Sequence, residues 1–312
     1  MATVRAPESH SPRGAAFPAE QSRARYPDTT GFVEREVVRL FYEVYGSGEP
    51  TILLLPTWSI VHSRHWKMQI PYLARQCRMI TFDGRGNGRS DRPGDSAAYD
   101  EREFVADALA VMDATETDSA TIVCFSLGAV RGLMLAADHP SRVDAAVFIG
   151  PGFGGGGEPL VERTVHSWED ELDTDEGWAK YNRHTWLRDY PGFLDFFFSK
   201  MFTEPHSTKP IEDCVGWGLE TTGQMLVTAN GGATPSPREF RELAARVRCP
   251  VLVIHGSSDA IVSSSRGAAL AEQTGGRLVL LEGSGHGPHV RDPVRVNLLL
   301  REFIQSLQGP AR

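Results

Sequence analysis

The sequence predicts an α/β fold: a doubly wound, mostly parallel sheet flanked by helices, with a helical segment inserted between its two halves. Short apolar, β-branched runs alternate with helical patterns between residues 51 and 150, as expected for parallel strands joined by right-handed crossovers. The same alternation resumes at Cys249. Residues 153–245 interrupt it with helical patterns and many aromatic side chains.

The individual elements follow from local periodicity and from residues that stop helices. Residues 34–45 alternate in hydrophobicity and predict a two-stranded hairpin, whereas the continuous apolar run 51–55 predicts a strand covered on both faces. Pro140 ends the helix that precedes it. The remaining predicted strands are 78–82, 120–123, 144–149, 251–254 and 278–281, and the predicted helices are 66–74, 103–115 and 127–139.

Bulk composition limits the function classes. The chain has 312 residues, of which 41% are hydrophobic and 23% charged, an ordinary globular balance. Its net charge of −8, without a Lys/Arg cluster, argues against a nucleic-acid partner. The four cysteines have no paired spacing, so we expect free thiols. No apolar run approaches the roughly 20 residues of a membrane span, and we expect a soluble, cytoplasmic protein.

Residues 1–28 differ from the rest of the chain. They are rich in Pro, Arg, Ser and Ala and show no hydrophobic periodicity. They also have no apolar core of the kind that a secretory signal peptide needs. We therefore expect a disordered N-terminal extension.

Ser126 is the first candidate catalytic residue. It lies in Cys124-Phe125-Ser126-Leu127-Gly128, between a predicted strand and a predicted helix. A serine on such a sharp turn has the form of a nucleophile elbow, which holds the hydroxyl above the sheet edge. Gly128 allows the helix to approach the strand closely because it has no Cβ.

Two further candidates follow other predicted strands. Asp259 comes after the run 251–254, and His286 comes after 278–281. A serine hydroxyl needs a base and a group that orients the base, and these residues suit those roles, with Ser126 as nucleophile, His286 as base and Asp259 as orienting carboxylate. His289 and Asp292 are the rivals for the last two roles.

Ser126, Asp259 and His286 occur in this order along the chain, each just after a predicted strand. With this pattern the chain resembles the α/β-hydrolase superfamily over roughly residues 30–307. Two segments strengthen the resemblance: Asp83-Gly84-Arg85-Gly86-Asn87-Gly88-Arg89-Ser90 is similar to a turn common in that superfamily, and Gly285-His286-Gly287-Pro288 is similar to its histidine loop. We expect Asp83 and Arg85 to fix loops around the site by hydrogen bonds. Cys124 departs from the usual small residue, and Pro56-Thr57 replaces the usual His-Gly.

The resemblance implies an oxyanion hole and a cap. The backbone N–H of Leu127 should supply one donor, and that of Trp58 the other, with Thr57 as the alternative. The chain would divide into the extension 1–28, a first core part 29–152, a helical cap 153–245 and a second core part 246–312. Aromatic residues of the cap favour a medium-sized, mainly apolar substrate. The side chains expected to line the pocket are Thr57, Trp58, Phe125, Trp186 and Phe197.

Two other motifs predict no cofactor. His62 and His65 have no third ligand nearby, so we expect no metal. Residues 152–157 match the pattern Gly-x-Gly-x-x-Gly, but they lie in mid-chain where the cap should begin, and we interpret them as a hinge or loop rather than a nucleotide site.

These expectations together predict a serine hydrolase that cleaves an ester, thioester or lactone of a small molecule through an acyl-enzyme. Three alternatives use the same three residues: hydrolysis of amides or of C–C bonds, perhydrolysis, and acyl transfer or cyclisation in natural-product tailoring. A ligand-binding receptor without turnover is a further alternative, because the Pro56-Thr57 loop would suit a weakened oxyanion hole.

Overall fold

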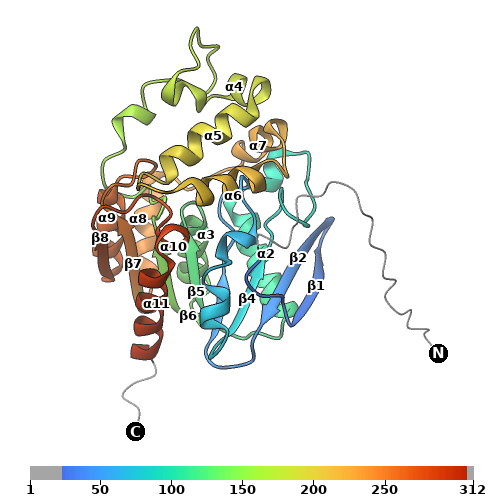
Figure 1. Cartoon of the computed structure of the whole chain (residues 1–312). Helices are drawn as coiled ribbons and strands as arrows, with labels where there is room; N and C mark the ends of the chain where they lie inside the picture. The colour runs from blue at the N-terminus through green and yellow to red at the C-terminus, as the bar shows by residue number, and fades with distance from the viewer. Residues whose placement is uncertain (1–22, 308–312) are drawn as a thin grey trace, which may run out of the picture.

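An eight-stranded sheet in the order β1-β2-β4-β3-β5-β6-β7-β8 forms the centre of the molecule in the computed structural model, which describes residues 23–307 (Figure 1). The strands are β1 (Thr29–Arg35), β2 (Val38–Tyr45), β3 (Thr51–Leu54), β4 (Arg78–Phe82), β5 (Ala120–Phe125), β6 (Val143–Ile149), β7 (Val251–Gly256) and β8 (Arg277–Leu281). The helices are α1 (Ile70–Leu73), α2 (Glu101–Ala114), α3 (Gly128–Asp138), α4 (Arg183–Arg188), α5 (Tyr190–Met201), α6 (Thr208–Gly218), α7 (Gly223–Asn230), α8 (Pro237–Arg246), α9 (Ser264–Thr274), α10 (Pro288–Arg291) and α11 (Pro293–Leu307).

The directions of the strands determine which strand ends lie at the same edge of the sheet. β1, β2 and β4 pair antiparallel, and every pairing from β4 through β3 to β8 is parallel. The predicted doubly wound, mostly parallel sheet is therefore confirmed. Because the parallel strands point the same way, the residues that follow β5, β7 and β8 emerge at one edge of the sheet.

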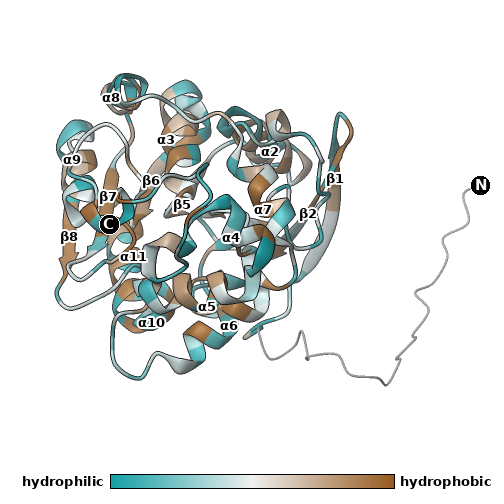
Figure 2. Cartoon of the chain, turned by 90° about the horizontal axis from the view of Figure 1, so that it is seen from above, coloured by the Kyte–Doolittle hydropathy of each residue, from teal (hydrophilic) through white to brown (hydrophobic). Residues whose placement is uncertain are grey.

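Helices cover both faces of the sheet, since its central strands are apolar on both sides. In β3, Ile52 and Leu54 belong to one hydrophobic cluster, and Leu53 belongs to the other. Seen from above, α2, α3, α8 and α9 lie on one side of the sheet, and α10 and α11 lie on the other (Figure 2). A sheet buried on both faces explains why its strands are continuous apolar runs in the sequence.

The segment between β6 and β7 lies over the carboxyl edge of the sheet (Figure 1). Its helices α4, α5, α6 and α7 cover this edge, and aromatic rings pack between them, as where Trp186 lies 4.7 Å from Phe193 between ring centroids. The last helix before β7, α8, instead packs beside α3 and α9 through Phe240 and Leu243.

Two predicted elements differ from the structure. The hairpin begins at Thr29 rather than Glu34, because the outer strand β1 is largely exposed and carries little hydrophobic periodicity. The single helix expected over residues 66–74 is a 3-10 turn (Ser63–Trp66) followed by the short α1. Pro71 has no N–H to donate inside a continuous helix, and proline is accommodated in the first turn of a helix. The α-helix therefore begins at Ile70, with Pro71 in its first turn.

The N-terminal extension lies mostly outside the described residues, which begin at Arg23. Residues 23–28 contact the sheet: Arg23 pairs with Glu43, and the Asp28 N–H donates to the Val44 carbonyl at 2.9 Å. Among the helices within residues 23–307, none combines the length and the apolar character that crossing a bilayer requires.

Candidate active site

The three predicted polar residues meet at the carboxyl edge of the sheet. Ser126 follows β5, Asp259 follows β7 and His286 follows β8. The Ser126 Oγ lies 2.9 Å from His286 Nε2, and His286 Nδ1 lies 2.7 Å from Asp259 Oδ2. A carboxylate only accepts hydrogen bonds, so Nδ1 carries the proton and Nε2 is left to accept from the serine hydroxyl. The order of contacts is the one that activates a serine.

The backbone of Ser126 adopts an unusual conformation. Its φ is +53°, in the left-handed region that residues with a side chain rarely occupy. The Ser126 N–H donates to the Ile149 carbonyl at 2.9 Å, which fixes the residue between β5 and β6. Strain held in this way by its surroundings is typical of functional sites. The strained turn places the hydroxyl above the sheet edge, as predicted.

The elbow also accommodates the departure at Cys124. The thiol is buried and faces Gly132 of α3, where any Cβ would collide with its Sγ. The larger residue in the strand is thus matched by the smallest residue in the helix. Gly128 has a similar role one turn earlier, because a Cβ there would lie 2.7 Å from the Pro56 carbonyl oxygen.

Asp259 is buried and receives four hydrogen bonds. Its Oδ1 accepts from the backbone N–H groups of Ile261 and Val262 at 2.8 and 2.9 Å. Its Oδ2 accepts from His286 and also from His255 Nε2 at 3.0 Å. Burial alone would raise the pKa of the Asp259 carboxyl, but the neighbouring His286 and His255 outweigh it and hold that pKa well below its usual value.

His255 was missed by sequence reasoning. Its Nε2 also lies 3.1 Å from the Val262 carbonyl, and since both neighbours are acceptors, Nε2 must carry the proton. His255 lies near the end of β7, four positions before Asp259. This close spacing to the predicted carboxylate is the feature of the sequence that could have identified it. Together His255 and His286 hold one carboxylate oxygen from two sides.

Two residues are expected to supply backbone donors for an oxyanion. Leu127 and Trp58 both line the cavity that contains the serine. Neither backbone N–H donates to a protein acceptor within residues 23–307. Both N–H groups are therefore without a protein acceptor in this part of the chain, as donors of an oxyanion hole must be.

A buried ion pair fixes the Pro56-Thr57 loop. Arg131 donates to the Pro56 carbonyl at 3.1 Å and to the Thr57 carbonyl at 2.5 Å, while its Nε pairs with Glu101 at 2.8 Å. Burial raises the pKa of the Glu101 carboxyl and Arg131 opposes that shift. The loop that replaces the usual His-Gly is thus held rigidly, by an arginine that the sequence reasoning did not identify.

Asp83 and Arg85 fix loops by hydrogen bonds, and this prediction is confirmed. Asp83 accepts from Ser63 and from the Arg89 N–H, and Arg85 makes two hydrogen bonds to Asp107, at 2.6 and 2.7 Å. Neither side chain reaches Ser126. Their role in the structure is to hold the turn after β4.

A cavity of about 210 Å³ opens above Ser126 between the sheet edge and the covering helices. Of the side chains predicted to line it, Trp58 and Phe197 do so, and their rings lie 5.2 Å apart. The structure places Thr57, Phe125 and Trp186 behind this wall rather than on it. All three are buried, and the Trp186 ring lies 5.4 Å from that of Trp58 between centroids.

His289 and Asp292, the alternatives for the base and the orienting carboxylate, have other hydrogen-bond partners than Ser126 and His286. His289 is buried 3.0 Å from His65 between Nε2 and Nδ1, and its ring packs against Phe125. Burial lowers the pKa of His289 to about 3, so the ring is neutral at physiological pH. Asp292 ends α10 and accepts from the Arg295 N–H, away from His286.

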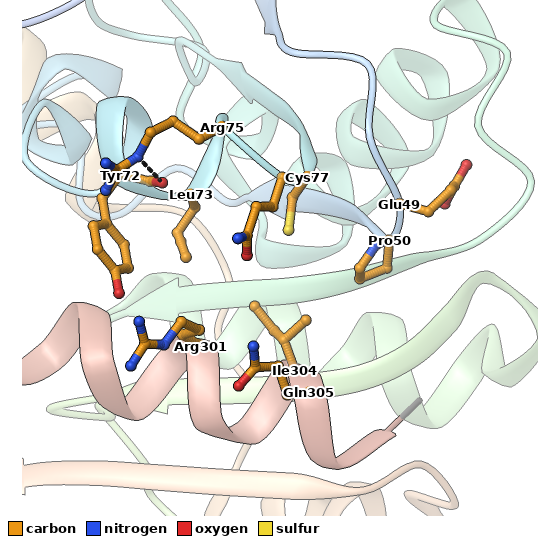
Figure 3. Close-up of a pocket in the computed structure, with 10 residues that line it drawn as sticks. Glu49, Pro50, Tyr72, Leu73, Arg75, Cys77, Arg301, Ile304 and Gln305 are labelled. Atoms are coloured by element: carbon orange, nitrogen blue, oxygen red, sulfur yellow. Dashed lines mark hydrogen bonds between the residues drawn. The ribbon is translucent and has the colours of Figure 1, made fainter. Parts of the chain in front are cut away.

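A second, larger cavity of about 430 Å³ lies at the opposite edge of the sheet, between α11 and the segment from Tyr72 to Cys77 (Figure 3). Pro50, on its wall, immediately precedes β3, so this cavity is at the amino ends of the strands. Parallel α/β sheets form their sites at the carboxyl ends. The geometry therefore favours the smaller cavity as the reaction site.

Comparison with known proteins agrees with this geometry. The family model described as alpha/beta hydrolase fold matches residues 50–293, and the chain belongs to this family. The mouse serine hydrolase BPHL is 25% identical over 271 residues, covering 86% of this chain and 84% of that protein. The 2-hydroxymuconate semialdehyde hydrolase of a Pseudomonas species is 27% identical over 266 residues, covering 79% and 83%.

A solved structure shares the arrangement of the whole core. The esterase RhEst1 of a Rhodococcus species superposes with a TM-score of 0.73 at 26% identity, covering 88% of this chain and 98% of the esterase. The relatives thus span esterases and other hydrolases at low identity, which defines the class of protein and leaves the substrate to be argued from the site.

Proposed function

We propose that the protein is a serine hydrolase that cleaves an ester, thioester or lactone of a medium-sized, mainly apolar small molecule through an acyl-enzyme. The observation that carries the proposal is the unbroken hydrogen-bond chain from Ser126 through His286 to Asp259, beside two unused backbone N–H groups. Relatives named as a serine hydrolase and an esterase support the same class.

In this mechanism Ser126 Oγ attacks the acyl carbon while its proton passes to His286 Nε2. The negative charge on the carbonyl oxygen is stabilised by the N–H groups of Leu127 and Trp58. His286 then returns the proton to the leaving oxygen or sulfur as the acyl bond breaks. Water then attacks the acyl-enzyme while its proton passes to His286, and His286 returns that proton to Ser126 Oγ as the acyl bond breaks, which releases the carboxylic acid and regenerates free Ser126.

We also propose that the segment 153–245 supplies the cap, through α4, α5, α6 and α7. These helices lie over the site, and Tyr181 and Phe197 reach the cavity wall. A cap in this place shields the site from bulk solvent and shapes the substrate pocket. The receptor alternative is less well supported, because Arg131 holds the Pro56-Thr57 loop firmly where an oxyanion donor is needed.

Ser126→Ala tests this proposal directly. Removal of a triad nucleophile lowers turnover by several orders of magnitude in other serine enzymes, roughly 10⁶-fold in the best-studied case. Wild type and variant would be compared on a panel of 4-nitrophenyl esters, thioesters and lactones, with circular dichroism to verify folding. Equal turnover by the two proteins would exclude Ser126 as the nucleophile.

A further inference from the structure

Two arginines line the Ser126 cavity without a carboxylate partner. The cavity wall carries three arginines, Arg131, Arg163 and Arg266, against a single acidic residue, Glu101. Glu101 is already paired with Arg131. Within residues 23–307, neither Arg163 nor Arg266 forms an ion pair with a carboxylate. The cavity wall is therefore cationic in a protein whose net charge is −8.

Arg163 is held in place by aromatic rings of the segment after β6 and by a backbone carbonyl of the loop after β7. It ends a 3-10 turn (Val161–Arg163) in the segment after β6, and its guanidinium lies 5.0 Å from the Trp178 ring centroid and 4.8 Å from that of Tyr181. Its Nη1 donates to the Ile261 carbonyl at 2.7 Å. Ile261 in turn donates to Asp259, so the arginine is linked to the loop that carries the triad carboxylate.

Arg266 stands at an electrostatically unfavourable position. It lies in the first turn of α9, where the helix dipole favours anions and disfavours cations, and that turn contains no acidic residue. Its side chain makes no hydrogen bond within the described part of the chain. Burial lowers the pKa of its guanidinium, and the nearby charge of Arg163 lowers it further. Two cations held close together without a counterion are what an anionic ligand would relieve.

We propose that this cavity takes substrates bearing a carboxylate, which Arg163 and Arg266 bind while Ser126 attacks the ester, thioester or lactone carbonyl. The inference rests on the proposed function and changes its substrate class from a medium-sized, mainly apolar molecule to a shorter one with one negative charge. Guanidinium groups bind carboxylates through paired N–H donors, and a cavity of about 210 Å³ suits a short acid better than a bulky ligand. Trp58 and Phe197 contact the apolar part.

Matched esters test the proposal. 4-Nitrophenyl hemiglutarate carries the carboxylate on its acyl side and 4-acetoxybenzoate carries it on its alcohol side, and the methyl ester of each is the neutral counterpart. Wild type should prefer at least one carboxylate over its methyl ester by tenfold or more in kcat/KM. In Arg163→Gln and Arg266→Gln this ratio should fall on the order of 10- to 100-fold, as for loss of a hydrogen bond to a charged group.

Two variants separate charge from general damage. Arg266→Lys keeps the positive charge and should retain part of the preference. Arg277→Gln removes an exposed arginine that pairs with Glu302 at the opposite end of β8, and the ratio should stay unchanged. Equal or better use of both methyl esters by wild type would overturn the proposal, as would Gln variants that lower both members of a pair alike.

A binding measurement keeps the proposal testable if no ester is cleaved. Absence of all turnover would contradict the proposed function and not this inference. Calorimetric titration of Ser126→Ala with 4-nitrophenyl hemiglutarate and its methyl ester would then decide. Tighter binding of the carboxylate, lost on adding Arg266→Gln, supports the site, and equal binding or no binding of the two compounds contradicts it.

Discussion

At the scale of single residues, the site depends on how tightly one carboxylate is held. Asp259 Oδ2 accepts from both His286 and His255, and its other oxygen accepts from two backbone N–H groups. A carboxylate with four donors cannot rotate, so the imidazole of His286 is oriented toward Ser126 before a substrate arrives. We therefore propose that His255 is a positioning residue that acts through Asp259.

His255→Phe should lower kcat about tenfold and leave KM nearly unchanged, because His255 lies behind Asp259 and does not line the cavity. The size follows from losing one hydrogen bond to a charged group. His255→Gln, which retains an N–H donor, should recover part of the loss. Steady-state kinetics on one ester would check this, and a rise in KM at constant kcat would refute a positioning role.

At the scale of elements, the geometry of the turn at Ser126 depends on the close approach of α3 to the loop after β3. The first residue of α3, Gly128, lies where a Cβ would be 2.7 Å from the Pro56 carbonyl oxygen. Arg131, one turn further along α3, holds the same loop by hydrogen bonds to Pro56 and Thr57. A single helix thus positions both Leu127 and the loop that carries Trp58.

Gly128→Ala should lower turnover at least 100-fold and destabilise the protein by about 1–3 kcal/mol, since the new methyl group must push the loop away. Helix propensity alone predicts the opposite sign, a gain of up to about 1 kcal/mol. Gly216→Ala in α6 is the matched control, because nothing lies within 4 Å of its Cβ position. Denaturant unfolding of both variants decides, and a stabilised Gly128→Ala would show that the close approach is unimportant.

The sequence predicted those site residues that directly follow a strand. Ser126, Asp259 and His286 each follow an apolar run, so their common edge could be inferred from strand direction. Arg163 and Arg266 are about a hundred residues apart, and only the packing of the segment after β6 on the sheet brings them to one cavity. The same packing puts Phe125 and Trp186 behind the wall, a detail that aromatic content alone does not determine.

At the scale of the whole molecule, a buried histidine pair lies beneath the site. His65 and His289 are hydrogen-bonded to each other at 3.0 Å and flank Phe125, the residue before Ser126. Burial lowers the pKa of both rings, that of His289 to about 3. Both rings are therefore neutral in the folded protein at a pH where they would be charged in the unfolded chain.

This pair makes stability depend on pH in a defined direction. The unfolded chain takes up a proton on His289 as pH falls below about 6.5, whereas the folded protein does not until about pH 3. The free energy of unfolding should therefore decrease with falling pH, by up to about 1.4 kcal/mol per pH unit for this residue. His289→Asn should lose that contribution between pH 6 and 4.

Urea unfolding at several pH values measures the slope. The exposed His206 supplies the control, and His206→Asn should leave the slope as in wild type. The contrast between the two variants removes the contribution of acidic residues, which titrate in all three proteins. An unchanged slope in His289→Asn would mean that His289 is protonated in the folded state.

We propose that Ser126 is an activated nucleophile, and one measurement tests this without knowledge of the substrate. Wild type and Ser126→Ala would be exposed to a fluorophosphonate and their intact masses recorded, since only an activated serine reacts readily with this reagent. We predict a single adduct on wild type and none on the variant. Failure of the folded wild type to react, or an equal adduct on both proteins, would contradict the account.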